Sequence, residues 1–167
     1  MAMTVLFEIA YEFEVSALAA DVFDVLSDVP ASASFFPKLH KLVDLGGNCY
    51  RWELDKVGPA QMTMQTVYAC HYVVDQKKCS VVWTPIAGAG NAQVGGSWAI
   101  TDKKNFTHLV LTSRGELQVP LPALMKSVVA PIVLGENEKL LKQYIANLTK
   151  RFGGKHSKES ISTCIKS

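Results

Sequence analysis

Strict alternation of apolar and polar residues marks the first segment of the chain. In residues 5–15 every odd position is apolar or aromatic, and three of the intervening positions are glutamate. This period of two predicts a β-strand with one buried face and one solvent-facing face. Ser16 then stands in position to cap a helix that continues to about Asp28, and Pro30 separates that helix from a second short helical segment at residues 31–36.

Turn residues divide the next part of the chain into a succession of strands. Glycine, asparagine, proline and short polar runs separate segments in which apolar residues again recur at alternate positions. These predicted strands are residues 39–45, 49–56, 61–75, 79–84, 91–101 and 106–119. Together with the first strand they give an antiparallel sheet of about seven strands.

After Pro122 the apolar pattern takes on a helical period. We expect one domain over residues 1–152, ending in a long helix that Pro131 and Gly135 bend or interrupt. Residues 153–167 are polar and are expected to form a flexible tail. The apolar stripe of the helix is predicted to consist of Leu124, Val128, Ile132, Leu141, Tyr144, Ile145, Leu148 and Phe152.

Composition and charge narrow the possible functions. The 167 residues are 49% hydrophobic and 19% charged, which is typical of a folded globular chain. A net charge of +2 argues against a nucleic-acid surface. No secretory signal or membrane-spanning stretch is evident, so we expect a cytoplasmic protein with reduced cysteines. Cysteine and histidine spacings fit no metal site and no glycine-rich loop opens a helix, so neither a metal nor a cofactor is expected.

The order of the predicted elements is accompanied by three local motifs, at residues 22–28 with 35–37, at 96–100 and at 115–122. This order of elements and these motifs resemble those of the helix-grip superfamily of START, Bet v 1-like and polyketide cyclase-like proteins, also called SRPBCC. The resemblance implies an α+β fold in which a curved antiparallel sheet of about seven strands wraps around a long C-terminal helix, with two short helices after the first strand. It also implies a hydrophobic cavity between sheet and helix, which members use for lipids, quinones, plant hormones or polyketides.

Residues of a single parity on each strand should face such a cavity. The same large side chains are also needed simply to fill a core, so contact with a ligand and packing alone both remain open for each of them. Hydroxyl groups among them could orient a ligand that carries one or two polar atoms. The candidate ligand-binding residues are Tyr11, Trp52, Met62, Met64, Thr66, Tyr68, Tyr72, Trp83, Trp98, Leu111, Ser113, Val128, Ile132 and Gly135.

Our leading hypothesis from the sequence is a carrier or sensor that binds a hydrophobic small molecule, whether lipid-like, quinone or aromatic. One alternative is a polyketide cyclase-like enzyme acting by proton transfer in the same cavity, with Tyr68 or Tyr72 as the acid and Arg114 holding an oxyanion if it points inward. Strand parity instead places Arg114, His108 and Glu116 on the outer face, so no catalytic residue is assigned.

A second alternative is a module that docks on a protein or a membrane. Apolar residues cover more than one side of the helix around residues 128–134, which fits either a cavity mouth or a docking surface. Gly135 and Pro131 could let this part of the helix move as a gate, or Gly135 could simply admit a close neighbouring strand. The identity of the ligand and the oligomeric state are left open by the sequence.

Overall fold

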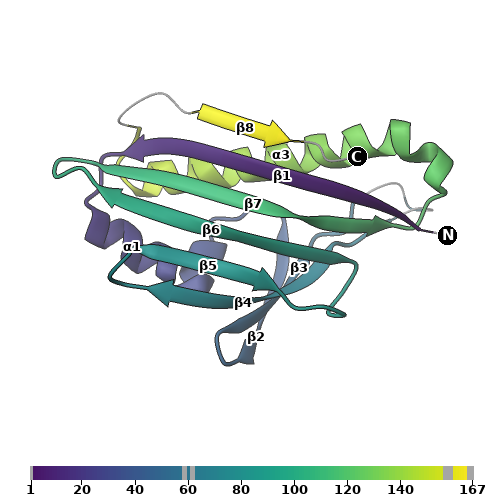
Figure 1. Cartoon of the computed structure of the whole chain (residues 1–167), viewed down its shortest axis with the longest axis horizontal. Coiled ribbons are helices and arrows are strands. Elements are labelled where there is room, and N and C mark those ends of the chain that lie inside the picture. The colour runs from purple at the N-terminus through teal and green to yellow at the C-terminus, as the bar shows by residue number, and fades with distance from the viewer. Residues whose placement is uncertain (1, 58–59, 61–62, 156–159, 165–167) are drawn as a thin grey trace.

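The computed structural model contains one sheet with a long helix lying across one of its faces (Figure 1). It describes residues 2–57, 60 and 63–155, together with the backbone of residues 160–164. In chain order the elements are β1 (Met3–Val15), α1 (Ala19–Ser27), α2 (Val29–Ala33), β2 (Leu39–Gly46), β3 (Cys49–Leu54), β4 (Val67–Asp75), β5 (Ser80–Pro85), β6 (Ala92–Asp102), β7 (Thr107–Val119), the 3-10 turn η1 (Ala123–Met125), α3 (Lys126–Arg151) and β8 (Ser160–Cys164).

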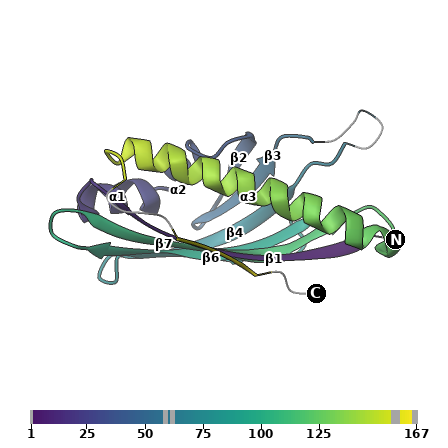
Figure 2. The same ribbon diagram turned by 90° about the horizontal axis from the view of Figure 1, so that it is seen from above.

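The strands form one antiparallel sheet in the order β2-β3-β4-β5-β6-β7-β1-β8. The first strand of the chain therefore returns to lie beside β7, and the two pair without a break from Met3–Val119 to Val15–Thr107. Figure 2 shows α3 running along one side of this curved sheet, with α1 and α2 at one end. The predicted α+β architecture, with two short helices after the first strand and a long C-terminal helix, is confirmed.

The alternation in β1 produces the buried face that the sequence predicts. Val5, Ile9, Tyr11, Phe13 and Val15 are almost completely buried. Four of them join the main core cluster under the C-terminal half of α3, whereas Val5 belongs to a smaller cluster under its N-terminal half. The alternation thus explains why one face of the sheet receives the helix.

The stripe of α3 differs from the predicted one in the N-terminal half of the helix. Leu141, Ile145 and Leu148 are buried as expected, but Val128 and Ile132 are 64% and 62% exposed. Nine residues separate Ile132 from Leu141, and at about 100° per residue this separation puts them on opposite sides of a helix. The residues that pack on the smaller core cluster here are Val129, Ala130, Val133 and Leu134. The predicted stripe was therefore wrong before Leu141.

Helix α1 does not begin at the predicted cap. It starts at Ala19, and no side chain caps its N-terminus. The backbone N–H groups of Ser16 and Ala17 instead donate to the carbonyl oxygens of Gly154 and Phe152, at 3.1 and 2.9 Å. Ser16 is thus held in the connection between β1 and α1, where it ties the end of α3 to the sheet.

Strand β4 is shorter than its predicted counterpart. Pairing in β4 starts at Val67, and the preceding Met64 forms only an isolated bridge with Val57. The alternation of apolar residues over 61–75 therefore continues through a segment that is not all strand.

Part of the predicted flexible tail is a strand in the structure. The backbone of β8 pairs antiparallel with residues 8–12 of β1. Without this pairing β1 would be an edge strand with unpaired N–H and C=O groups, and a segment of five residues is enough to satisfy them there. A composition rich in serine and lysine gave no sign of this pairing.

Candidate functional site

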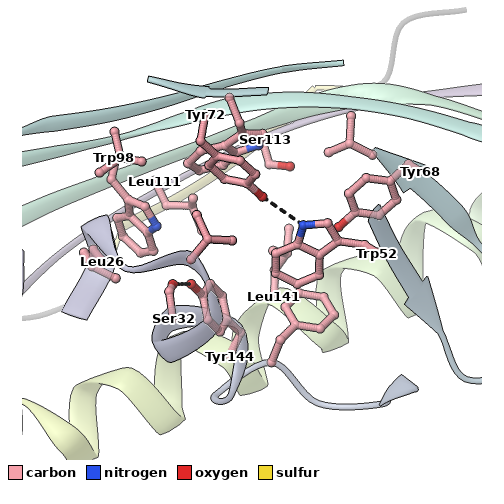
Figure 3. Close-up of a pocket in the computed structure, with 15 residues that line it drawn as sticks. Leu26, Ser32, Trp52, Tyr68, Tyr72, Trp98, Leu111, Ser113, Leu141 and Tyr144 are labelled. Atoms are coloured by element: carbon pink, nitrogen blue, oxygen red, sulfur yellow. Dashed lines mark hydrogen bonds between the residues drawn. The ribbon is translucent and has the colours of Figure 1, made fainter. Parts of the chain in front are cut away.

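A cavity of about 70 Å³ lies between the sheet and the helices (Figure 3). Its walls come from the α1–α2 region, from the five consecutive strands β3 to β7, and from α3. None of the lining side chains is charged, and most are aromatic or aliphatic. They are Leu26, Val29, Ser32, Phe36, Trp52, Tyr68, Tyr72, Val81, Trp83, Val94, Trp98, Leu111, Ser113, Leu141 and Tyr144.

Aromatic rings in mutual contact form much of this wall. Trp52 stacks on Tyr68 with ring centroids 5.9 Å apart and planes 10° from parallel. Phe36, which follows α2, meets the edge of Trp52 at 5.6 Å and lies 5.4 Å from the ring of Tyr144 on α3. Such ring contacts stabilise a wall beyond the area they bury, and here they link the sheet to both helical layers.

Two hydrogen-bonded groups lie at different ends of the cavity. At one end the Trp52 indole Nε1–H donates to the Tyr72 hydroxyl at 2.9 Å. At the other end the hydroxyls of Ser32 and Tyr144 are hydrogen-bonded to each other, and the Trp98 ring lies 6.2 Å from the ring of Tyr144. Figure 3 shows the first pair near Tyr68 and Ser113 and the second beside Leu26. The lining is therefore apolar with two small polar groups.

Burial keeps the cavity tyrosines in their neutral form. Desolvation, reinforced by the nearby Cys70 thiol, raises the pKa of Tyr68 and Tyr72 well above 10. Desolvation also raises the pKa of Tyr144 to about 12, although its hydrogen bond with Ser32 acts in the opposite direction. At neutral pH these hydroxyls are hydrogen-bond donors or weak acids, and their phenolate forms are strongly disfavoured.

The neighbouring Cys70 is equally unsuited to act as a charged group. Its thiol is fully buried and donates to the Val94 carbonyl oxygen at 3.1 Å. Burial raises the pKa of this thiol to about 12. A nucleophilic or metal-binding cysteine requires an accessible thiolate, which this environment opposes. Among the described residues, no group of three or more His, Cys, Asp or Glu side chains is placed to hold a metal ion.

Comparison with solved structures relates this arrangement to known folds. A START superfamily protein from Mycobacterium smegmatis superposes with a TM-score of 0.65 at 15% identity, over 87% of this chain and 97% of that one. The Zhui aromatase/cyclase from Streptomyces sp. R1128 gives a TM-score of 0.58 at 16% identity, over 87% and 90%. A norcoclaurine synthase from Thalictrum flavum gives 0.52 at 18% identity, over 90% and 97%. The chain has the helix-grip fold. No protein-family model and no curated protein sequence matches it.

The helix-grip sheet brings half of the predicted ligand-binding residues to the cavity. Each of these residues lies on the parity that the sequence predicted to face inward. Whether they contact a ligand remains a prediction, because their placement in the wall is equally compatible with packing. They are Trp52, Tyr68, Tyr72, Trp83, Trp98, Leu111 and Ser113.

The remaining predicted residues lie elsewhere. Tyr11 is buried in the main core, with its ring edge-on to Phe13 at 5.8 Å, and does not line the cavity. Met64 packs against the smaller core cluster, and Thr66 accepts a hydrogen bond from the Leu54 N–H through its carbonyl oxygen. Met62 lies outside the described residues.

The helix residues predicted to contact a ligand are also away from the cavity. Val128 and Ile132 face outward, for the reason of helical phase given above. Helix α3 continues through Pro131 without interruption. A Cβ added to Gly135 would meet no atom within 4 Å, so no close neighbouring strand requires glycine at this position.

The helical side of the wall is the part that sequence reasoning missed. Leu26, Val29, Ser32 and Phe36 enter the cavity from α1, α2 and the segment that follows. A signal for them existed, because an apolar helix face precedes the aromatic pair Phe35–Phe36, but we used that pattern only to recognise the fold. Leu141 and Tyr144 were assigned to the helix stripe without being assigned to the site.

Charged groups considered for catalysis lie on the outer face of the helix-grip sheet. His108 is placed between two carboxylates, with Nε2 at 2.8 Å from Glu12 Oε1 and Nδ1 at 3.6 Å from Glu14 Oε2. Arg114 is exposed and lies opposite Glu8 in the β1–β7 register. The parity argument that turned these residues away from the cavity is therefore confirmed for His108 and Arg114.

Proposed function

We propose that this helix-grip protein binds an uncharged hydrophobic small molecule in the cavity and serves as its carrier or sensor. The observation that carries the proposal is the lining itself: a wall with three tryptophans, three tyrosines and a phenylalanine, and no charged side chain. Small-molecule sites typically combine an apolar wall with a few polar groups that fix orientation. Ser32, Ser113 and the tyrosine hydroxyls supply such groups here.

The size of the cavity supports a ligand whose binding involves movement of the wall. A volume of about 70 Å³ is smaller than that of sites which enclose a drug-sized ligand, about 300–1,000 Å³. The α2 region and Phe36 cover the cavity from the helical side and are attached to α3 through Ser32–Tyr144 and through the bond from Asn147 Nδ2 to the Phe35 carbonyl at 2.9 Å. Displacement of this segment would enlarge the cavity without breaking the sheet.

Native mass spectrometry of freshly purified protein tests the proposal directly. We expect a mass excess that disappears when the same sample is denatured. Ser113→Leu, which fills the cavity from β7, should abolish the excess. Thr112→Leu makes the same change at the adjacent, outward-facing position and should retain it. Absence of any bound molecule, with no thermal stabilisation by fatty acids, quinones or flavonoids, would refute the proposal.

A cyclase-like enzyme is the second candidate, favoured by likeness in fold to an aromatase/cyclase and by the cluster of tyrosine hydroxyls in the cavity. In that case Tyr68 or Tyr72 would act as a general acid on an enolisable substrate. Tyr68→Phe separates the two candidates, because it should reduce turnover by at least about 100-fold in an enzyme but change ligand affinity only a few-fold in a carrier.

A docking module is a third candidate, and the exposed apolar side of the N-terminal part of α3 favours it. Leu124, Val128 and Ile132 are each more than 60% exposed. No helix among the described residues is long and apolar enough to cross a membrane. Val128→Asp should abolish sedimentation with phosphatidylcholine vesicles if this surface docks on lipid, and should leave small-molecule binding unchanged.

A further inference from the structure

The hydrogen-bonding direction at the Trp52 end of the cavity is set by the indole. An indole N–H can donate but cannot accept, so the Tyr72 oxygen must be the acceptor in the 2.9 Å bond. The proton of Tyr72 is then available for another partner. Among the described residues the structure records no acceptor for it. Tyr72 is therefore a donor left without a partner in the cavity wall.

The opposite end of the cavity is organised differently. There the hydroxyls of Tyr144 and Ser32 are hydrogen-bonded to each other, so at least one of the two protons has an acceptor within the protein. The Tyr144 end therefore has a serine hydroxyl as partner of its tyrosine, whereas the Tyr72 hydroxyl has only the indole N–H, which cannot accept its proton.

Two more hydroxyls share the open end with Tyr72. Figure 3 shows Tyr68 and Ser113 on either side of the Trp52–Tyr72 pair, away from Ser32 and Tyr144. Neither hydroxyl has a recorded hydrogen bond among the described residues. Burial, which keeps the pKa of Tyr68 and Tyr72 high, ensures that both remain protonated. At this end of the cavity, therefore, no described residue accepts the proton of Tyr72, Tyr68 or Ser113 in a recorded hydrogen bond.

We propose that the cavity selects an uncharged aromatic ligand bearing a carbonyl or equivalent acceptor oxygen, which receives the hydrogen bond of Tyr72, with Tyr68 and Ser113 beside it. This inference rests on the proposed function, and it specifies the class of ligand. A carbonyl oxygen would accept the Tyr72 proton, for which the described residues show no hydrogen-bond acceptor, and an aromatic body fits against the rings of Trp52 and Trp83. A carboxylate or an ammonium group would be desolvated among side chains that carry no opposite charge.

Matched bicyclic probes test this selection. The three tryptophans of the chain all line the cavity, so their indole N–H signals in an NMR spectrum report on its occupancy. We would titrate the protein with indane, 1-indanone and indane-1-carboxylate. We expect 1-indanone to bind roughly 3- to 10-fold tighter than indane, as one net hydrogen bond allows. The carboxylate should bind at least about 10-fold more weakly than the ketone.

The outcomes separate failure of the inference from failure of the proposed function. If indane binds as tightly as 1-indanone, the cavity holds small molecules but its donors do not select a carbonyl, and the inference is overturned. If none of the probes shifts any indole signal, the proposed function fails together with the inference. A purely apolar cavity would favour indane, because the ketone must give up its hydration.

Variants test whether the preference for 1-indanone over indane depends on the hydrogen-bond donors of Trp52 and Tyr72. Trp52→Phe combined with Tyr72→Phe removes the two donors of the hydrogen-bonded pair and leaves the Tyr68 and Ser113 hydroxyls in place. Because the proposed bond comes from Tyr72, the ratio of the two affinities should fall toward one, while indane still binds. Tyr50→Phe is the matched control, because its ring packs edge-on to Tyr72 at 5.8 Å but does not line the cavity. If the double variant does not fold, Tyr72→Phe alone should enlarge the ketone-induced shift of the Trp52 indole proton, which then donates directly. Retention of the ketone preference in the double variant, or an unchanged Trp52 shift in Tyr72→Phe, would overturn the inference.

Discussion

Removing the Tyr144 hydroxyl should destabilise the protein because it leaves the buried Ser32 hydroxyl without its partner. Tyr144→Phe keeps the ring, and with it the contacts to Phe36 at 5.4 Å and Trp98 at 6.2 Å. It removes the partner of the Ser32 hydroxyl, and Ser32 is buried. A buried polar group left unpaired costs about 1–3 kcal/mol, so we expect the free energy of unfolding to fall by that amount.

Urea denaturation followed by tryptophan fluorescence measures this change, and the melting temperature should fall by roughly 3–10 °C. Ser32→Ala alone should cost about 1 kcal/mol. The double variant Tyr144→Phe/Ser32→Ala should cost less than the sum of the single variants by about 1 kcal/mol, because the two hydroxyls are coupled. Tyr50→Phe, which alters no cavity group, should stay within about 0.5 kcal/mol of the wild type. A Tyr144→Phe variant as stable as this control, or strict additivity in the cycle, would show that the hydroxyl group does not hold α2 to α3.

Three further predictions concern the core. Leu148→Ala, at a fully buried position, should lower the free energy of unfolding by about 3–5 kcal/mol. Ile132→Ala, on the outward side of α3, should change it by less than about 0.5 kcal/mol. Similar losses for the two variants in urea denaturation would contradict the assignment of Leu148 to the buried side of α3 and Ile132 to the exposed side. Gly96→Ala should cost about 1–3 kcal/mol in the same assay, because the added Cβ would lie 2.2 Å from the Thr112 carbonyl oxygen, and an unchanged melting curve would refute that close approach. Burial raises the pKa of Cys70 from 9.0 to about 12, so its contribution to stability is complete below pH 9 and is lost as the pH rises toward 12. Cys70→Ala should therefore make the decline of stability between pH 9 and 12 shallower by up to about 1.4 kcal/mol per pH unit, and an identical decline in both proteins would exclude this cause.

The sheet was predictable because each strand carries its orientation in its own residues. Alternation over β1 and β7 identifies the buried face without knowledge of any partner, and the structure places Leu109 and Leu111 inward and His108 and Arg114 outward accordingly. The order in which the strands pair, by contrast, cannot be read from the residues of any one strand. The return of β1 to β7 followed from the resemblance to a known fold, and the addition of β8 beside β1 depends on an edge that no single segment reveals.

The helical half of the site was less predictable because the side of a helix on which a residue lies depends on its distance along the chain from residues already known to be buried. A strand that slips by one residue reverses its face at once, and the sequence pattern shows the error. A helix whose two apolar stripes are separated by nine residues can be read as one continuous stripe, as happened between Ile132 and Leu141. The contribution of Ser32 and Phe36 required knowing that the short α2 region lies over the open side of the sheet, which depends on tertiary packing.

The separation of charge from the cavity is the feature that most constrains its chemistry. In the described part of the chain no charged side chain lines the cavity, and His108 lies on the outer face of the sheet between Glu12 and Glu14. The cavity itself offers tyrosines whose pKa is raised by burial, and these can donate a proton or a hydrogen bond but hold a phenolate only at high pH. Proton abstraction would therefore need a base brought by the substrate or by water, whereas recognition of a neutral acceptor needs nothing beyond the groups already in place. This asymmetry is why binding is the stronger proposal for this cavity and catalysis the weaker one.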